Sequence, residues 1–365
     1  MSSRRSSAST EGSSRNGFAV ILRLYDQAMA TRKRPTLYSL QAGRRRRRPA
    51  PRPRPAVAIG VALALIPVLL IGYVVWTIRP LMDRSAGVIP PGAGVVNQPL
   101  DGPEAEAPTG GTAGLTATGA RHRPLPGVTL SAGILVDSKT GRVLWMRKAH
   151  ERRAIASLTK LMTVHLIAES SLGRSFAVSA QALGLPGEVL GLRAGQRVRT
   201  RDMLAAALVS SANDAAAALA IQRSGSVRGF VALMNHEARR LELRDTRFSN
   251  PSGIYDEGNH SSAWDLAQLT RIVLADKRLA RLARSKVVVA SGGGDYVNTN
   301  QMLWEYQGAI GVKTGFTDVA GRCLAAAATR NGRTLVAIVL DSTGSEFATA
   351  THLLDWGFRQ LRRGR

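Results

Sequence analysis

Predicted strands at both ends of residues 128–365, with predicted helices between them, constrain the fold more than any other feature of this sequence. Thr129–Val136 and Arg142–Met146 are rich in strand-forming residues, and the turn at Asp137–Gly141 between them predicts a hairpin. Three more strands are expected near the C-terminus, at Ala309–Lys313, Cys323–Thr329 and Arg333–Asp341. Asn331-Gly332 is a strong hairpin turn between the last two. We therefore expect one mainly antiparallel sheet built from both ends of the domain.

The middle of this domain carries helical patterns, which predict a helical insertion facing the sheet. Helices are expected at Ser157–Glu169, Thr200–Leu208, Ala212–Gln222, Val227–Leu241, Ser262–Leu274 and Ser345–Gln360, and short strands at Phe176–Ser179, Arg197–Arg199 and Lys286–Ala290. Thr200 is an expected N-cap, as is Ser261 or Ser262. The predicted fold class is α/β, of the α+β kind, with helices flanking the sheet.

One candidate catalytic pair is Ser157 and Lys160, which lie three positions apart and so share one face of a helix. A serine hydroxyl attacks poorly until a base removes its proton, and a desolvated lysine can be that base. Backbone N–H groups at the start of a helix also favour developing negative charge. The spacing S-x-x-K arises by chance about once in every few hundred residues, so an ordinary surface Ser and Lys is the competing interpretation.

Two later motifs give this pair an ordered context. Ser211-Ala212-Asn213 lies in a loop between two predicted helices, and Lys313-Thr314-Gly315 ends a predicted strand. Ser14-Arg15-Asn16 and Lys139-Thr140-Gly141 fit the same two patterns, but the first lies in a basic tail and the second at a predicted hairpin tip. Of these four sequences, only Ser211-Ala212-Asn213 and Lys313-Thr314-Gly315 come after Ser157, which gives the order S-x-x-K, S-x-N, K-T-G. Each lies on a plausible secondary-structure element.

This order resembles the penicillin-recognising serine acyltransferases, and within them the low-molecular-mass penicillin-binding proteins that are D-alanyl-D-alanine carboxypeptidases. The resemblance covers roughly residues 128–360. Its matching blocks are Ala156–Thr163, Ser211–Ala216, Asn250–Gly253, Gly311–Thr317, Ala320–Leu324 and Asp355–Phe358. The resemblance implies a β-lactamase/transpeptidase-like fold and a serine-type catalytic domain at residues 128–365.

The resemblance also implies four catalytic roles. Ser157 would attack the D-Ala–D-Ala bond of the peptidoglycan stem peptide and become an acyl-ester, and Lys160 would take its proton. Ser211 would relay a proton to the departing D-Ala. Asn213 would bind the acyl-side amide of the substrate and steady Lys160.

Four further residues would bind the substrate. Lys313 and Thr314 would hold its terminal carboxylate, since a cation beside a hydroxyl favours a free C-terminus. Gly315 would leave room for the peptide along the strand. The backbone N–H of Phe316 would hold the oxyanion together with that of Ser157. β-Lactams would be covalent inhibitors, and no cofactor or metal is expected.

Two positions depart from the commonest family pattern. Ile155 stands where the family usually has Pro, and Phe316 varies the residue after K-T-G, but neither change removes a chemical group. Family members often carry a second, β-rich domain and a C-terminal membrane helix. Because the chain stops soon after Phe358, we expect an N-terminal span to replace that anchor.

Three alternatives remain open at this point. A D,D-endopeptidase uses the same machinery on cross-links. A serine β-lactamase needs an additional carboxylate to activate the deacylating water, for which Asp256 and Glu257 are candidates by position only. A non-catalytic wall-binding scaffold is the third.

The span is predicted at Pro55–Ile78, which contains no charged residue and is long enough to cross a bilayer as one helix. Arg44–Arg48 on its N-terminal side, and Tyr73 with Trp76 near its far end, fit the positive-inside rule and the aromatic belt. A cleaved signal peptide is the rival, but it would need a short n-region. We expect a single-pass membrane protein whose catalytic domain lies outside the cytoplasm.

Two low-complexity segments flank this span. Residues 1–54 read as a basic disordered cytoplasmic tail, and residues 79–127 as a linker rich in Gly, Pro and Ala. The tail carries fourteen Lys and Arg against two acidic residues, about half of the excess in a net charge of +25. Because the span explains this location, no nucleic-acid partner is expected. Cys323 is the only cysteine, which excludes an intrachain disulfide and a cysteine-based metal cluster.

Overall fold

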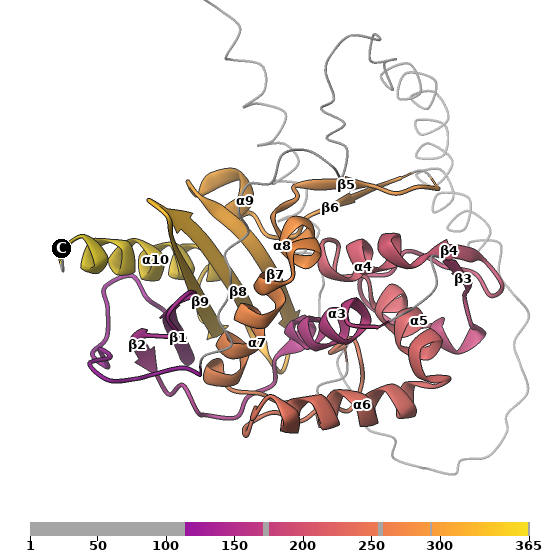
Figure 1. Cartoon of the computed structure of the whole chain (residues 1–365), viewed down its shortest axis with the longest axis horizontal. Helices are drawn as coiled ribbons and strands as arrows, with labels where there is room; N and C mark the ends of the chain where they lie inside the picture. The colour runs from indigo at the N-terminus through magenta and orange to yellow at the C-terminus, as the bar shows by residue number, and fades with distance from the viewer. Residues whose placement is uncertain (1–113, 171–174, 255–257, 293, 364–365) are drawn as a thin grey trace, which may run out of the picture. The chain divides into compact units, whose positions relative to one another are not determined.

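The computed structural model describes residues 114–170, 175–254, 258–292 and 294–363 (Figure 1). The predicted cytoplasmic tail (1–54), the predicted transmembrane helix (55–78) and most of the predicted linker lie outside the described residues, as do Asp256 and Glu257. Among the residues that are described, no helix combines the length and apolar character that crossing a bilayer requires.

The main sheet is antiparallel throughout. Its strands are β1 (Ala132–Asp137), β2 (Val143–Arg147), β7 (Ala309–Thr317), β8 (Gly321–Arg330) and β9 (Arg333–Ser342), in the order β2-β1-β9-β8-β7. The N-terminal β1 pairs with the C-terminal β9, with Ile134 opposite Ile338. The prediction of one sheet built from both ends of the domain is confirmed.

Helices form the insertion and the two layers around the sheet. Those described are α3 (Lys160–Ala168), α4 (Thr200–Leu208), α5 (Asn213–Ser224), α6 (Val227–Arg240), α7 (Ala263–Ala275), α8 (Lys277–Arg284), α9 (Met302–Glu305) and α10 (Glu346–Arg363), with 3-10 turns η1 (Ala156–Thr159) and η2 (Ala180–Ala182). Two small hairpins pair β3 (Ser175–Ala177) with β4 (Arg197–Arg199) and β5 (Val287–Val289) with β6 (Asp295–Val297).

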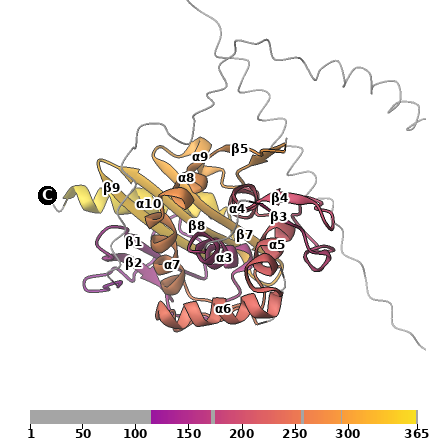
Figure 2. The ribbon, with the colours of Figure 1, turned by 45° about the vertical axis from the view of Figure 1, so that its right-hand side comes forward.

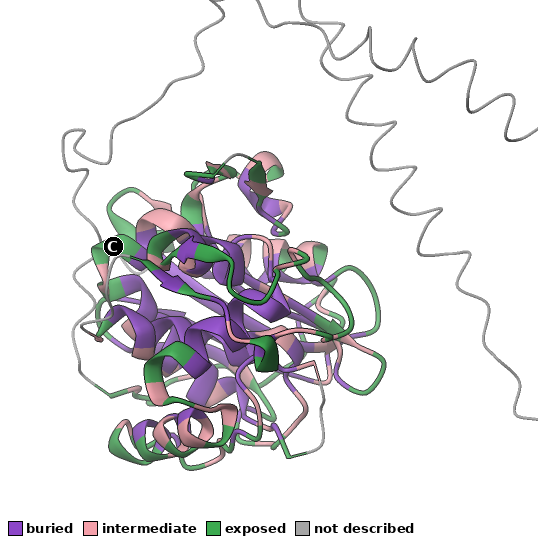
Figure 3. Cartoon of the chain, turned by 90° about the vertical axis from the view of Figure 1, so that its right-hand side faces the viewer, coloured by how far each residue is buried: buried purple, intermediate pink, exposed green. Residues whose placement is uncertain are grey.

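Both faces of the sheet are buried. Along β8, Leu324 and Ala326 belong to the apolar cluster that includes α10, whereas Ala325 and Ala327 belong to the cluster that includes α3 and α7. Figures 1 and 2 show α10 on one side of the sheet and α3 with α7 on the other, and Figure 3 shows the buried residues concentrated between these layers. This double coverage explains why the centre of β8 is a continuous apolar run instead of an alternating one.

Several elements differ from the sequence-based expectation. Thr200 is not the N-cap of α4 but lies inside the helix, because Arg199 is the extended residue that precedes it. Ser262 does cap α7, accepting a hydrogen bond from the Asp265 N–H at 3.2 Å. α8, α9 and β6 were not expected; α8 follows α7 almost directly and is capped by Asp276, whose carboxylate accepts from the Arg278 N–H at 2.8 Å.

The folded unit includes part of the stretch predicted as a linker. Thr116 and Arg121 form parallel bridges to Arg142 and Trp145, next to and within β2, and Leu125 is buried in the cluster that includes α10. The sequence shows no strand pattern in this segment. Its pairing with β2 consists of isolated bridges and not of a continuous strand, so an alternating pattern is not required. Residues 114–127 therefore pack along the outer edge of β2.

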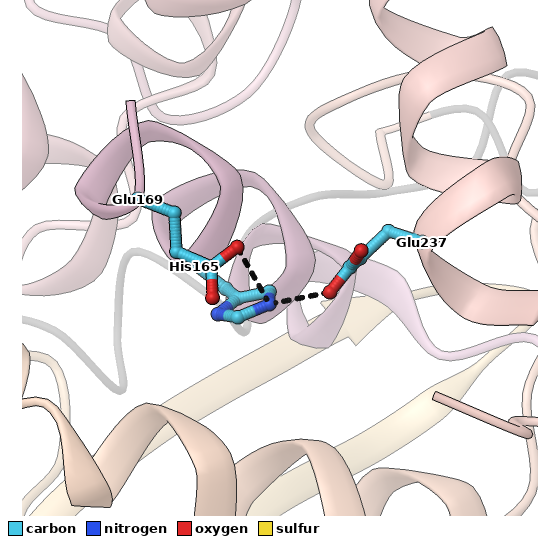
Figure 4. A group of neighbouring side chains, drawn as sticks. All are labelled: His165, Glu169 and Glu237. Atoms are coloured by element: carbon cyan, nitrogen blue, oxygen red, sulfur yellow. Dashed lines mark hydrogen bonds and ion pairs between the residues drawn. The ribbon is translucent and has the colours of Figure 1, made fainter. Parts of the chain in front are cut away.

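A charged cluster joins α3 to α6 (Figure 4). His165 Nε2 lies 2.9 Å from Glu237 Oε1 and 3.6 Å from Glu169 Oε2. These three residues offer ligand atoms within 4.8 Å of one another, a spacing that could hold a metal ion. However, Arg240 donates to both oxygens of Glu237, at 2.7 and 2.6 Å, so a cation already neutralises this carboxylate. The cluster is an ion-pair network that fixes α3 against α6.

This network predicts an acid-sensitive contribution to stability. Burial raises the pKa of Glu237, but hydrogen bonds from Arg240 and His165 outweigh burial, and the net shift is below the ordinary value of 4.5. A lowered carboxyl pKa stabilises the fold above the unfolded-state value, and this contribution is lost as the pH falls through the folded-state value. At pH 7, Glu237→Gln should lower the free energy of unfolding by about 1.5–3 kcal/mol, the range for hydrogen bonds to a charged group, and the deficit should shrink below pH 4.5.

Urea unfolding of both proteins at pH 7 and pH 3 measures this difference. Glu242→Gln, at a side chain that is 75% exposed, is the matched control and should change little at either pH. A deficit for Glu237→Gln that stays the same at both pH values would contradict the assignment.

Candidate active site

Ser157 lies in the 3-10 turn η1, which runs directly into α3 at Lys160. The sequence predicts that Ser157 opens an α-helix; the structure instead places it in this tighter turn, with Ala156 before it in the left-handed region at φ +46°. Two glycines confine the turn. A Cβ on Gly315 of β7 would lie 3.1 Å from the Ser157 nitrogen, and a Cβ on Gly253 would overlap the Ala156 carbonyl. The turn is therefore held between β7 and the loop that contains Gly253.

Lys160 is fully buried, and its amine nitrogen lies within hydrogen-bond distance of three oxygen atoms. These are Ser157 Oγ at 2.8 Å, Asn213 Oδ1 at 2.8 Å and the Ser252 carbonyl oxygen at 2.7 Å. The pKa of Lys160 lies well below that of an ordinary lysine because burial disfavours the charged amine, and the positive charge of Lys313 adds to this effect. A neutral amine next to a hydroxyl can accept the hydroxyl proton.

The S-x-N motif brings two side chains to the start of α5. Ser211 is buried, and its backbone adopts the left-handed conformation, with φ at +63°. Its hydroxyl makes no side-chain hydrogen bond to any described residue. Asn213 is the first residue of α5; its amide oxygen accepts from Lys160 and its amide nitrogen donates to the Pro186 carbonyl at 2.8 Å. Asn213 therefore links Lys160 to the loop at Pro186.

The K-T-G motif lies inside β7, which continues to Thr317, whereas the predicted strand was Ala309–Lys313 with the motif at its end. The register Thr317↔Gly321 with β8 extends the strand past the motif. Lys313 is two residues before Gly315 and so on the same side of the strand. Its side chain is buried, which lowers its pKa to about 7.

The remaining predicted residues are more exposed. The Thr314 hydroxyl lies 2.6 Å from that of Thr299, a contact that no sequence motif indicated. Phe316 is 53% exposed, and the Arg322 guanidinium lies 5.8 Å from its ring centroid. The role predicted for Phe316 concerns its backbone N–H and does not involve this exposed ring.

Three elements far apart in the sequence thus meet at one place. Ser157, Lys160 and Asn213 are in direct contact, Gly315 abuts the Ser157 backbone, and the charge of Lys313 acts on Lys160. Sequence reasoning missed Thr299, the carbonyl of Ser252, and Glu188, whose negative charge acts on both Lys160 and Lys313. A backbone acceptor has no residue signature, although Ser252 falls in one of the matching blocks. The arrangement places a serine hydroxyl against one buried lysine amine, with the charge of a second buried lysine acting on that amine.

Comparison with known proteins assigns the family. A family model described as D-alanyl-D-alanine carboxypeptidase matches residues 120–344. The chain belongs to this family. D-alanyl-D-alanine carboxypeptidase DacF of Bacillus subtilis is similar to it, with 34% identity over 241 residues, 63% of this chain and 62% of DacF. The chain thus spans less than two thirds of that relative.

Two other members of the same group are also similar to the chain. A D-alanyl-D-alanine endopeptidase of Pseudomonas aeruginosa is 34% identical over 265 residues, 66% of this chain and 83% of the relative. The crystal structure of penicillin binding protein 6B from Escherichia coli matches with a TM-score of 0.61 and 31% identity, covering 67% of this chain and 81% of that one. The fold of this chain is therefore similar to that of a penicillin-binding protein, with mixed α/β structure and an antiparallel sheet.

Gly253 provides a test of whether its close contact with the Ala156 carbonyl holds the turn that carries Ser157. Gly253→Ala would place a methyl group against the Ala156 carbonyl, at a backbone φ of +77° that favours glycine. We expect acylation by penicillin to slow by at least about tenfold because a displacement of about 1 Å can cost a hundredfold in rate. Stopped-flow acylation measures the effect. Gly332→Ala, in the β8–β9 turn at φ +70° with open space around it, carries similar backbone strain and should retain the rate. Equal slowing in both variants would contradict the role of the contact.

Proposed function

We propose that this chain is a membrane-anchored, serine-type D-Ala-D-Ala carboxypeptidase that removes the terminal D-Ala from the peptidoglycan stem peptide. The observation that carries the proposal is the buried Lys160 amine 2.8 Å from the Ser157 hydroxyl. Its lowered pKa favours the neutral amine, which can act as a base. Family membership and the relatives named as carboxypeptidases support the same reaction.

Acylation would begin with attack of Ser157 Oγ on the carbonyl carbon of the D-Ala–D-Ala bond. Lys160 takes the hydroxyl proton as the new C–O bond forms, and the backbone N–H groups of Ser157 and Phe316 stabilise the oxyanion. The C–N bond then breaks, and Ser211 passes a proton to the leaving amine. Asn213 orients Lys160 and binds the acyl-side amide.

Substrate selection would depend on the free carboxylate of the last D-Ala. Lys313 and Thr314 bind this carboxylate, and Gly315 lets the peptide lie along β7. Water hydrolyses the acyl-enzyme on Ser157 in the second half of the reaction, with Lys160 again accepting the proton. The same nucleophile would open the β-lactam ring of penicillin, and the name of the similar Escherichia coli protein supports penicillin binding.

Two related activities use the same site. The similar Pseudomonas aeruginosa endopeptidase makes D,D-endopeptidase activity the second candidate, and cleavage of pentapeptide compared with a cross-linked dimer separates the two. A β-lactamase would release penicillin many times per second, whereas the proposed enzyme stays acylated. The two carboxylates considered for that activity, Asp256 and Glu257, lie outside the described residues.

Covalent labelling tests the nucleophile. Intact-mass measurement should show one penicillin added to the wild-type chain and none added to Ser157→Ala, whose D-Ala release should fall by about a thousandfold or more. Ser170→Ala, which changes a hydroxyl near the other end of α3, should still be labelled. A labelled Ser157→Ala protein would rule out Ser157 as the nucleophile.

The pH dependence of substrate binding tests Lys313. Its pKa is lowered to about 7, so the ammonium form decreases as the pH rises through this value. KM for the peptide should therefore increase above pH 7, by up to about tenfold per pH unit. Steady-state kinetics from pH 6 to pH 9 measure this. Lys139→Ala, in the other K-T-G sequence at the β1–β2 turn, should keep the wild-type profile, and a flat wild-type KM would exclude carboxylate binding by Lys313.

The anchoring proposal rests on residues 1–127. Residues 55–78 would cross the membrane once with residues 1–54 in the cytoplasm, and residues 79–113 would connect the span to the catalytic domain outside. The uncharged stretch and the preceding arginine run support this topology.

Truncation tests the anchor. The full chain should sediment with membranes and resist alkaline carbonate, whereas a chain that begins at residue 79 should be soluble. Deleting residues 1–54 should leave D-Ala release unchanged within about twofold, since surface segments away from a site act weakly. N-terminal sequencing of the membrane-bound protein separates an uncleaved anchor from a signal peptide, and a soluble full chain would contradict the proposal.

A further inference from the structure

Glu188 belongs to a segment that is fastened to the start of α5. The Asn213 N–H donates to the Glu188 carbonyl at 2.7 Å, and the Asn213 side-chain amide donates to the Pro186 carbonyl at 2.8 Å. The Asp214 carboxylate accepts from the Leu190 N–H at 3.0 Å and from the Leu192 N–H at 3.2 Å. The backbone on both sides of Glu188 is thus fixed to the residues of the S-x-N motif.

Gly187 shows how closely this backbone approaches Asn213. It has a φ of +80°, and a Cβ at this position would lie 3.1 Å from Asn213 Nδ2. The backbone of the next residue, Glu188, is therefore held against Asn213, which fixes the point from which its side chain extends.

The Glu188 side chain is exposed, and no hydrogen bond or ion pair to it is present among the described residues. Even so, its negative charge raises the pKa of both Lys160 and Lys313, opposing the effect of burial. A carboxylate with no partner of its own thus stands close enough to influence both active-site amines. A held, unpaired charge beside a cleft is suited to binding an opposite charge on a ligand.

Resting on the function proposed above, we propose that Glu188 is a specificity-determining residue that recognises a positively charged side chain on the acyl side of the substrate. Asn213 would bind the acyl-side amide, and Glu188 is bonded to Asn213 through its backbone. Lys313 would bind the carboxylate at the other end. The site therefore presents a cation to the leaving residue and an anion to the residue before the D-Ala–D-Ala pair.

Two synthetic peptides test this assignment directly. Nα-acetyl-L-Lys-D-Ala-D-Ala carries a free ammonium, and Nα,Nε-diacetyl-L-Lys-D-Ala-D-Ala has the same skeleton without the charge. Wild-type protein should prefer the first in kcat/KM by about two- to fivefold at low ionic strength, the range of an exposed ion pair. The preference should decrease in 0.5 M salt because salt screens exposed charges.

Glu188→Gln should remove this preference. Loss of the charge also lowers the pKa of Lys160 and Lys313, which affects both peptides alike, so the readout is the ratio of their kcat/KM values. Glu188→Asp should retain part of the preference. Glu305→Gln, which neutralises an exposed carboxylate on α9 whose charge does not act on either lysine, should keep all of it.

Three results would overturn the inference. An unchanged preference in Glu188→Gln would show that another group reads the charge. An equal loss with both peptides would assign Glu188 to chemistry that the two share, such as activation of the deacylating water. Cleavage of neither peptide by the wild-type protein would reject the proposed function itself, and the inference with it; that outcome is distinct from the first two.

Discussion

The burial of one amine organises this structure. Lys160 has no exposed surface, so its amine must be uncharged or fully bonded, and it meets three hydrogen-bond partners from three separate parts of the chain. Ser157 is on the same turn, Asn213 comes from the start of α5, and Ser252 comes from the loop that follows α6. Losing any one partner would leave a buried polar group without its hydrogen bond. The need to satisfy Lys160 therefore fixes the relative positions of these three elements.

The surrounding residues tune the charge of this amine. Lys313 lowers the pKa of Lys160, Glu188 opposes that effect, and both act in a region where burial already disfavours charge. Lys313 is also buried, which lowers its pKa to about 7, but only Lys160 has the positive charge of another buried lysine acting on it. In the proposed function this difference in surroundings suits Lys160 to act as a base and Lys313 to act as a cation that binds an anion.

The sequence predicted the sheet and the long helices well because their apolar patterns and hairpin turns are local signals. Asn331-Gly332 indicated the β8–β9 hairpin, and the predicted strands at both ends of the domain indicated that they form one sheet. The extent of β7 past Lys313 was not predicted, since it depends on pairing with β8. Thr200 was expected to cap α4 from its residue type alone, although the backbone of Arg199 decides where the helix begins.

The two edges of the main sheet have different surroundings, which limits where the N-terminal side of the domain can be truncated. The outer side of β2 is bridged by Thr116 and Arg121, whereas β7 has no strand partner on its outer side among the described residues. An open edge can pair with any extended chain, and proteins usually protect such edges. Here the segment before residue 128 protects the edge remote from Ser157. A fragment that began at residue 128 would expose a second edge and become prone to self-association, even though its catalytic side chains were complete.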